Sequence, residues 1–135
     1  MRELTVKALT ENIPQVTAFL DEQLEAADCP LKAQMQIDVA IDELFSNIAN
    51  YAYAPGTGDA TVRFDFDESV RTVSICFSDH GKPFNPLKNA DPDLSLPAEE
   101  REIGGLGIFL VKKTMDEVAY RYENGMNVLT IQKKI

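Results

Sequence analysis

Glu43 and Asn47 stand four residues apart in a segment with helical periodicity, so their side chains should project from one helix face, one turn apart. An amide oxygen is a suitable hard ligand for Mg²⁺, and a carboxylate one turn away could orient or deprotonate an attacking hydroxyl. The pair therefore fits chemistry on phosphate groups. Taken alone, it fits a polar, solvent-facing helix surface at least as well.

A second segment, Asp79-His80-Gly81, follows directly on an apolar strand pattern. A carboxylate at a strand end could accept a hydrogen bond from an exocyclic amine such as that of adenine, and Gly81 would permit close backbone approach. The alternative is an ordinary Asp-x-Gly turn leaving a strand. His80 has no Ser, Cys or second His partner in the pattern, and we assign it no role.

A third segment, Gly104-Gly105-Leu106-Gly107, stands immediately before a helical pattern. Backbone amides there, together with the positive end of the helix, could hold a phosphate. The segment lacks the Gly-Lys-Ser/Thr ending of a Walker loop, and no dinucleotide-binding pattern precedes it. Alone it could equally be a flexible linker. The three segments taken in order, with their different chemical groups, indicate an ATP site.

The elements that must position these segments follow from hydrophobic periodicity. We expect five strands, over residues 4–9, 62–66, 73–77, 118–122 and 128–132. We expect three helices: one between Asn12-Ile13-Pro14 and Asp28-Cys29-Pro30, one over residues 31–53 and one over residues 107–115. Asn12 should cap the first helix, with Pro14 in its first turn.

The connections between these elements complete the expected fold. Residues 79–101 contain four prolines and little periodicity, which predicts one long loop of the kind that often serves as a lid or binding segment. The pair Asn124-Gly125 predicts a hairpin between the last two strands. Together the elements predict an α+β fold, a two-layer α/β sandwich with about three helices on one face of a mixed, mostly antiparallel sheet.

Length and composition bound the function. A chain of 135 residues that is 44% hydrophobic and 26% charged fits one domain over residues 1–135. The net charge of −9 disfavours direct nucleic-acid binding. No signal-peptide core and no membrane-length apolar stretch stand out, so we expect a cytoplasmic protein without a membrane role. Cys29 and Cys76 are too far apart in sequence to suggest a disulfide framework or a metal site.

Taken together, these motifs resemble those of the ATP-binding domain of the gyrase, histidine kinase and mismatch-repair ATPase superfamily, which has the Bergerat-type fold. Within it, the sequence is most similar to the bacterial anti-sigma factor serine kinases. The motifs that carry the resemblance are Glu43-x-x-x-Asn47, Asp79-x-Gly81-x-Pro83-Phe84, Gly104-Gly105-Leu106-Gly107-Ile108-Phe109-Leu110, Met115-Asp116-Glu117-Val118 and the tail from Asn124 to Thr130.

The resemblance implies ATP and Mg²⁺ as cofactors and a role for each site residue. Glu43 would be the general base, and Asn47 would hold Mg²⁺. Asp79 would bind the adenine amine, and Gly81 would allow the nucleotide to approach. The phosphates would be wrapped by the glycine segment, which consists of Gly104, Gly105, Leu106 and Gly107.

The resemblance also implies partners. The substrate would be a serine on a small antagonist protein, and the second partner would be a sigma factor that a homodimer of this chain sequesters, in a stress response that regulates transcription. The chain would then be a protein serine kinase. The alternative is an ATP-binding regulatory interaction module without significant kinase activity.

Two positions depart from the family pattern. Some members carry an arginine just before the glycine segment, where this chain has Ile103, with Arg101 two residues earlier. The family's closing hairpin often supplies a threonine near adenine, where Asn127 falls, and this leaves Thr130 as the nearest candidate threonine. The roles of Arg101 and Asn127 therefore stay open at the level of sequence.

Overall fold

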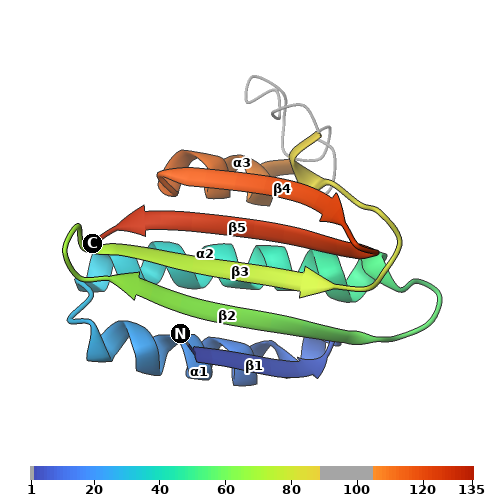
Figure 1. The fold of residues 1–135 in the computed structure, drawn as a ribbon, viewed down its shortest axis with the longest axis horizontal. Helices are drawn as coiled ribbons and strands as arrows, with labels where there is room; N and C mark the ends of the chain where they lie inside the picture. The colour runs from blue at the N-terminus through green and yellow to red at the C-terminus, as the bar shows by residue number, and fades with distance from the viewer. Residues whose placement is uncertain (1, 89–104) are drawn as a thin grey trace.

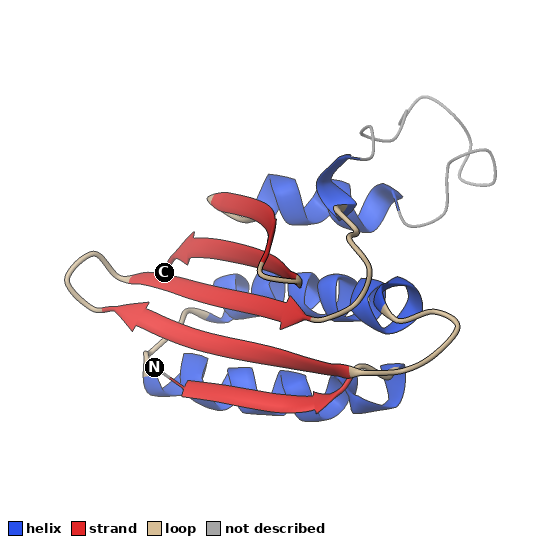
Figure 2. Ribbon diagram, turned by 45° about the vertical axis from the view of Figure 1, so that its right-hand side comes forward, coloured by secondary structure: helices blue, strands red, loops and turns tan. Residues whose placement is uncertain are grey.

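The computed structural model describes residues 2–88 and 105–135, which form a sheet with helices on one face (Figures 1 and 2). The strands are β1 (Arg2–Lys7), β2 (Asp59–Asp67), β3 (Thr72–Asp79), β4 (Glu117–Glu123) and β5 (Met126–Lys134). The helices are α1 (Ile13–Ala26), α2 (Leu31–Asn47) and α3 (Gly105–Thr114). Shorter turns are the 3₁₀ turns η1 (Thr10–Asn12) and η3 (Pro86–Lys88) and the π-helical turn η2 (Ile48–Ala52).

The sheet has the strand order β1-β2-β3-β5-β4, and all four pairings among the described residues are antiparallel. The α+β two-layer architecture is confirmed, whereas the expected admixture of parallel pairing is absent from the described strands. The physical reason is the chain path. After β3 the chain passes through α3 and β4 and then returns as β5, which lies between β3 and β4 in the sheet. β3 and β4 therefore run in the same direction but do not pair with each other.

The expected hairpin between β4 and β5 forms, and β2 and β3 form another. In the β4–β5 turn, Asn124 and Gly125 adopt φ angles of 53° and 76°, the left-handed pair that a two-residue I′ turn requires. The β2–β3 connection is held by Asp67, whose Oδ1 accepts hydrogen bonds from the backbone N–H of Ser69 at 3.0 Å and from its hydroxyl at 2.6 Å. Local turn chemistry therefore sets the register of both strand pairs.

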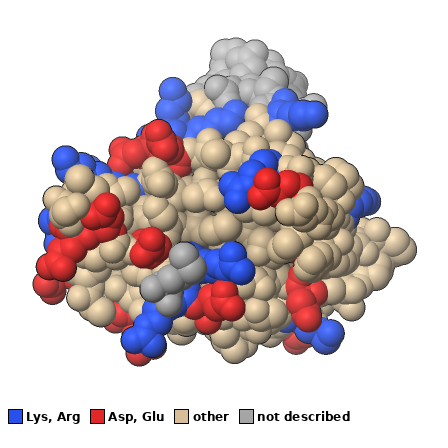
Figure 3. Space-filling view, in the orientation of Figure 1, with Lys and Arg blue, Asp and Glu red and all other residues tan. Residues whose placement is uncertain are grey.

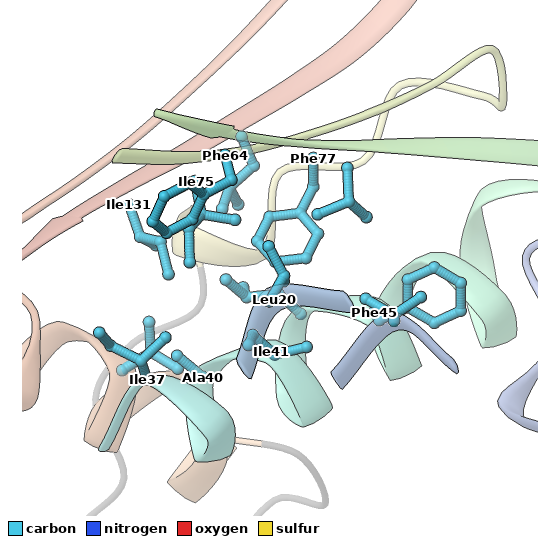
Figure 4. Close-up of a cluster of buried hydrophobic side chains, with 14 of the residues drawn as sticks. Leu20, Ile37, Ala40, Ile41, Phe45, Phe64, Ile75, Phe77 and Ile131 are labelled. Atoms are coloured by element: carbon cyan, nitrogen blue, oxygen red, sulfur yellow. The ribbon is translucent and has the colours of Figure 1, made fainter. Parts of the chain in front are cut away.

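The core lies between the sheet and the helices, and it follows from the two periodicities of the sequence. In β3, Val73, Ile75 and Phe77 alternate toward the helices and are almost fully buried. They meet the three- and four-residue stripes of the helices, among them Leu20 of α1 and Ile37 of α2, as Figure 4 shows. The same alternation, continued by one step along β3, turns the side chain of residue 79 toward the helix layer.

Helix α1 begins with Pro14 in its first turn, as expected, but Asn12 does not cap it. The Asn12 side chain instead donates to the carbonyl of Lys7 at 2.9 Å, because the 3₁₀ turn η1 precedes the helix and brings that carbonyl within reach. At the other end, Arg71 Nη2 donates to the carbonyl of Ala27 at 3.0 Å. This guanidinium satisfies carbonyl groups that the helix leaves unpaired.

Helix α2 does not end as an α-helix. Its last residues continue as the π-turn η2, so the expected helix over residues 31–53 is present with a wider final turn. Just beyond it, the Tyr53 hydroxyl donates to the carbonyl of Asp59 at 2.6 Å and accepts from the backbone N–H of His80 at 2.8 Å. The widened turn and Tyr53 therefore link the end of the helix to the end of β3.

The surface carries mixed charge. In the face that Figure 3 shows, acidic and basic side chains are interspersed over the sheet without a broad patch of either sign. On α2, Leu31, Met35 and Val39 are more than half exposed. No helix in the described ranges combines the length and the apolar character that crossing a membrane would demand.

Candidate functional site

A small apolar cavity lies between the C-terminal half of α2 and the inner face of the sheet. Its enclosed volume is about 30 Å³. Its lining comes from helix, strands and the segment after β3, and consists of Leu44, Asn47, Ile48, Ala52, Phe77, Asp79, Phe84, Pro86, Tyr120, Asn127 and Leu129. Two of the predicted site residues, Asn47 and Asp79, thus reach one cavity from different elements.

Asp79 is the last residue of β3, and its side chain is only 3% exposed. Its Oδ1 accepts the backbone N–H of Gly81 at 2.9 Å and the amide Nδ2 of Asn127 at 2.9 Å. A buried carboxyl group needs such donors to offset its loss of water. The arrangement leaves a hydrogen-bond acceptor on the wall of an otherwise apolar cavity.

Gly81 has a structural reason to be glycine. A Cβ at this position would lie 2.3 Å from the carbonyl oxygen of Ala52 in η2, a distance that real Cβ atoms essentially never show. The next residue, Lys82, donates its backbone N–H to the same carbonyl at 2.9 Å. The segment after β3 is therefore packed directly on the π-turn. The expected role of Gly81 in nucleotide approach stays a prediction beside this packing role.

Glu43 and Asn47 lie on the same side of α2, as their spacing predicts, with the Asn47 amide close enough to affect the Glu43 carboxyl group. The pKa of Glu43 is raised, chiefly because the carboxyl group is partly buried; the Asn47 amide opposes this effect, and the nearby charge of Asp42 adds to it. A carboxyl group with a raised pKa is a better proton acceptor once ionised. Such a carboxyl group beside an amide oxygen has the chemistry that a proton acceptor and a metal ligand need.

The first turn of α3 meets Glu43. A Cβ on Gly107 would lie 2.2 Å from Glu43 Oε2, so only glycine leaves room for the carboxylate there. Helix α3 begins at Gly105, two residues before the expected start, which places Gly105 and Gly107 in its first turn. The first backbone N–H groups of a helix have no partner within it and can bind anions.

Several predicted features lie outside the described residues. Gly104, Arg101 and Ile103 belong to the range 89–104, as does most of the expected loop over residues 79–101. The side chain of Leu106 is also outside what the structure describes, although its backbone is in α3. The structure therefore brings together Glu43, Asn47, Asp79, Gly81 and Gly107 and is silent on the rest of the glycine segment.

Sequence reasoning placed Asn127 near the site without assigning it a role. Asn127 is 5% exposed and lies opposite Asp79 in the β3–β5 ladder. The available signal was its alternation with Leu129 and Ile131 on the inward face of β5, where a polar residue is unexpected. Thr130, the other candidate, does not reach the cavity. It is three residues after Asn127 on the same strand, so its side chain points to the outer face of the sheet.

A second missed feature is aromatic. The rings of Tyr51 and Phe84 lie 5.2 Å apart at an angle of 32°, and Phe84 also lines the cavity. Phe84 belongs to the motif that begins at Asp79, but no role followed from it and no pattern singled out Tyr51, because the two rings meet only when the segment after β3 folds back over η2. They form an aromatic wall beside the cavity.

The donor set fits a nucleotide with a metal ion. Asp79 offers an acceptor within apolar walls, as a purine with an exocyclic amine needs, and Asn47 and the first turn of α3 lie on the side where phosphates would extend. Among the described residues, no three His, Cys, Asp or Glu side chains gather as a metal cage. A magnesium ion held by one amide oxygen together with phosphates and waters is consistent with that donor set.

Comparison with known proteins agrees with this geometry. Residues 6–133 match the model of the histidine kinase-like ATPase domain family. The chain is similar to the serine/threonine-protein kinase BtrW of Bordetella bronchiseptica, at 26% identity over 100 residues that cover 74% of this chain and 70% of BtrW. It is also similar to the serine-protein kinase RsbW of Bacillus mycoides, at 32% identity over 95 residues.

The extent of these matches differs. The RsbW alignment covers 67% of this chain but 58% of RsbW, so the chain spans little more than half the length of that relative. The family model, in contrast, covers nearly every residue of the chain. The chain belongs to the family of histidine kinase-like ATPase domains.

Proposed function

We propose that this chain is an ATP-dependent protein serine kinase of the anti-sigma factor type. One observation carries the proposal: Asp79 and Asn47 line a single cavity, and Glu43, one helical turn before Asn47, meets the first turn of α3. These groups lie in the order that a nucleotide would require, with an acceptor for the base, an amide for the metal, and a carboxylate beside the phosphate-binding helix end.

The base would enter between α2 and the sheet. Leu44, Ile48 and Leu129 offer apolar surface to its ring, and Asp79 accepts a hydrogen bond from its exocyclic amine. The enclosed volume of about 30 Å³ corresponds to roughly one water molecule, so the wall made by Phe84 and Pro86 has to withdraw when a purine enters. Both residues belong to the segment that follows β3 rather than to the sheet, and their side chains can shift while the backbone N–H of Phe84 keeps its hydrogen bond to Asn127 Oδ1.

Phosphoryl transfer depends on positioning and charge neutralisation. A magnesium ion held by Asn47 would neutralise part of the phosphate charge. The backbone N–H groups at the start of α3 hold phosphate oxygens. Glu43 accepts the proton of the serine hydroxyl as that oxygen attacks the terminal phosphorus, and the bond from this phosphorus to the oxygen of ADP breaks.

The partners follow from the resemblance and from the relatives. Both named relatives are protein kinases, and RsbW is named a serine-protein kinase. By the motif resemblance, the substrate is a serine on a small antagonist protein and the second partner is a sigma factor bound by a homodimer in the cytoplasm. Sedimentation of the chain alone, and with a candidate sigma factor with and without ATP, tests dimerisation and capture.

Glu43→Gln tests the catalytic assignment. We expect ATP binding within about threefold of wild type and transfer to an antagonist protein lowered by about 10²-fold or more, since general bases contribute on that order. Labelled ATP with phosphosite mapping measures transfer, and calorimetry measures binding. Asp42→Asn, which changes an exposed neighbouring acid on the same helix, is the matched control. Undiminished transfer in Glu43→Gln would rule out Glu43 as the base.

The runner-up function is an ATP-binding regulatory interaction module. The observation that favours it is Ile103, which stands where some family members carry the arginine that reaches the terminal phosphate. Such a module would retain labelled ATP and change its partner affinity without forming phosphoserine. A kinase forms phosphoserine on the captured antagonist, so one incubation separates the two functions.

A further inference from the structure

Asn127 stands on β5 directly opposite Asp79 on β3, at the point where both strands reach the cavity. It is 5% exposed and occupies the inward face of its strand, which further along carries Leu129 and Ile131. A buried amide on an apolar face is costly unless every donor and acceptor is paired. The pairing of this side chain therefore shows what it does.

Every hydrogen-bonding position of the Asn127 amide is used by the protein. Nδ2 donates to Asp79 Oδ1 at 2.9 Å and to the carbonyl of Lys82 at 2.8 Å. Oδ1 accepts the backbone N–H of Phe84 at 3.0 Å and the hydroxyl of Tyr120 at 2.5 Å. An asparagine amide has two donors and two acceptor positions, so none remains for a ligand.

The backbone partners fix which way the amide points. The carbonyl of Lys82 can only accept and the N–H of Phe84 can only donate, so a flipped amide would place like groups against each other at both positions. Nδ2 must therefore face Asp79. One side chain ties the end of β3, the segment after it, β4 and β5 together in a single orientation.

This orientation decides which oxygen of Asp79 faces the cavity. Oδ1 is taken by Asn127 and by the N–H of Gly81. Among the described residues, no hydrogen bond reaches Oδ2 of Asp79. Oδ2 is thus an acceptor with a fixed direction, in a cavity whose other walls are largely apolar.

We propose that Asn127 is a positioning residue that makes the site select 6-aminopurine over 6-oxopurine nucleotides by fixing Asp79 Oδ2 toward the cavity. This inference rests on the proposed ATP site. Adenine presents an N–H donor at its 6-position, whereas hypoxanthine presents a carbonyl oxygen there, which would face an acceptor. Asn127 itself touches no part of the nucleotide, because its own groups are all engaged.

Calorimetric titration of wild type and Asn127→Ala with MgATP and with MgITP tests the proposal. Wild type should prefer ATP by about tenfold or more, because a buried acceptor that faces another acceptor is left unpaired. In Asn127→Ala, ATP affinity should fall by about that factor while ITP affinity changes by less than about twofold, so the preference is lost. Thr130→Ala, which changes a side chain on the outer face of the same strand, is the matched control and should keep the preference.

A purely structural role predicts a different result. If Asn127→Ala weakens ATP and ITP binding equally, the selectivity inference is wrong and the ATP site stands. If wild type binds neither nucleotide, the proposed function is wrong and the inference falls with it. The two failures are therefore distinguishable in one set of titrations.

Asn127→Asp keeps the shape of the side chain and covers the case in which the alanine variant does not fold. In titrations between about pH 5.5 and pH 8, the repulsion between the two facing carboxyl groups should weaken as the pH falls, because a proton shared between them restores a donor to Asp79. ATP affinity relative to wild type should rise as the pH falls. The neighbouring phenols of Tyr53 and Tyr120 have pKa values raised above 10 by burial, so they do not titrate in this range. A deficit independent of pH would contradict the inference.

Discussion

At the scale of single residues, two glycines serve different purposes. At Gly81 an added Cβ would meet backbone atoms of Ala52, which cannot withdraw without moving η2. At Gly107 it would meet the end of the flexible Glu43 side chain, which can rotate away. The first glycine is therefore needed for the fold. The second is needed for the position of one carboxylate.

Gly107→Ala should separate stability from activity. Alanine favours a helix by about 0.5–1 kcal/mol over glycine, so the free energy of unfolding should stay level or rise. Displacement of the Glu43 carboxylate should lower phosphoryl transfer about tenfold or more. Urea unfolding and a transfer assay measure the two effects. Leu110→Ala, at an exposed position of the same helix, is the control. Wild-type transfer in Gly107→Ala would show that Glu43 does not need this position.

The sequence was sufficient to predict contacts between site residues that lie close together in the chain. Glu43 and Asn47 share a helix side because they are one turn apart on α2. The pairing of Asp79 with Asn127 depends on the register of two strands whose partner residues are 48 positions apart. No local sequence pattern reveals that register. The alternation of side chains along β5 also excludes Thr130, which points to the opposite face of the sheet from Asn127.

At the scale of elements, the contact between α1 and α2 contains a pair of acids. Oδ1 of Asp21 and Oδ1 of Asp38 are enclosed, and neither has a hydrogen-bond donor in the described part of the chain. The two carboxyl groups can bond to each other only through a shared proton. Burial, together with the hydrogen bond to Asp21 and its charge, raises the pKa of Asp38 to about 7.

This pair predicts a dependence of stability on pH. Because the pKa of Asp38 is higher in the folded chain than its usual value of 3.8, the folded state holds a proton that the unfolded state releases. The stabilisation is complete below the usual value and is lost as the pH rises through about 7. Asp38→Asn supplies a permanent donor, so it should raise the unfolding free energy at pH 8 by about 1 kcal/mol, a figure discounted for partial solvent exposure.

Urea unfolding of wild type and Asp38→Asn near pH 4, 6 and 8 measures this effect. The difference between the two proteins should grow with pH and vanish near pH 4. Asp42→Asn, at an exposed acid on the same helix, should leave the pH profile unchanged. A constant difference across the range would show that the acid pair does not share a proton.

The elements themselves were predicted well where one periodicity dominates. The hairpin at Asn124-Gly125 and the first two helices lie where the pattern places them, apart from shifts of a few residues. The π-turn η2 was not predictable, since residues 48–52 continue the helical pattern and the widening depends on packing against Gly81. The sequence pattern indicates which helix face points to the core. It does not show that Leu31, Met35 and Val39 are exposed, because apolar residues at helical spacing look the same in a sequence whether they are buried or exposed.

At the scale of the whole molecule, a net charge of −9 works against a polyanionic ligand. On the proposed function, binding of ATP would come from local groups, namely the start of α3, Asn47 and the apolar cavity. We therefore expect binding to depend strongly on magnesium, which would cancel part of the nucleotide charge.

MgATP should stabilise the folded chain. At a ligand concentration 100 times the dissociation constant, the gain is about 2.7 kcal/mol, which is visible as a rise in the midpoint of thermal unfolding. Magnesium alone should give no rise, and ATP with a chelator should give a much smaller one. Asp79→Asn keeps an oxygen for its internal hydrogen bonds but places an amide donor near the adenine amine, so it should lose most of the gain. An equal gain in wild type and Asp79→Asn would place the nucleotide elsewhere.

The strand order has a consequence for how the protein is made. β5 follows β4 in sequence yet lies between β3 and β4, so during synthesis both neighbours exist before the strand that joins them. Until β5 has left the ribosome, β3 has one unpaired edge, of the kind that recruits other chains, and Asp79 has no Asn127 to orient it. By the proposed function, a nascent chain at this stage would have no complete nucleotide site. ATP would therefore stabilise only chains in which β5 is already paired, and it would not guide the assembly of the sheet.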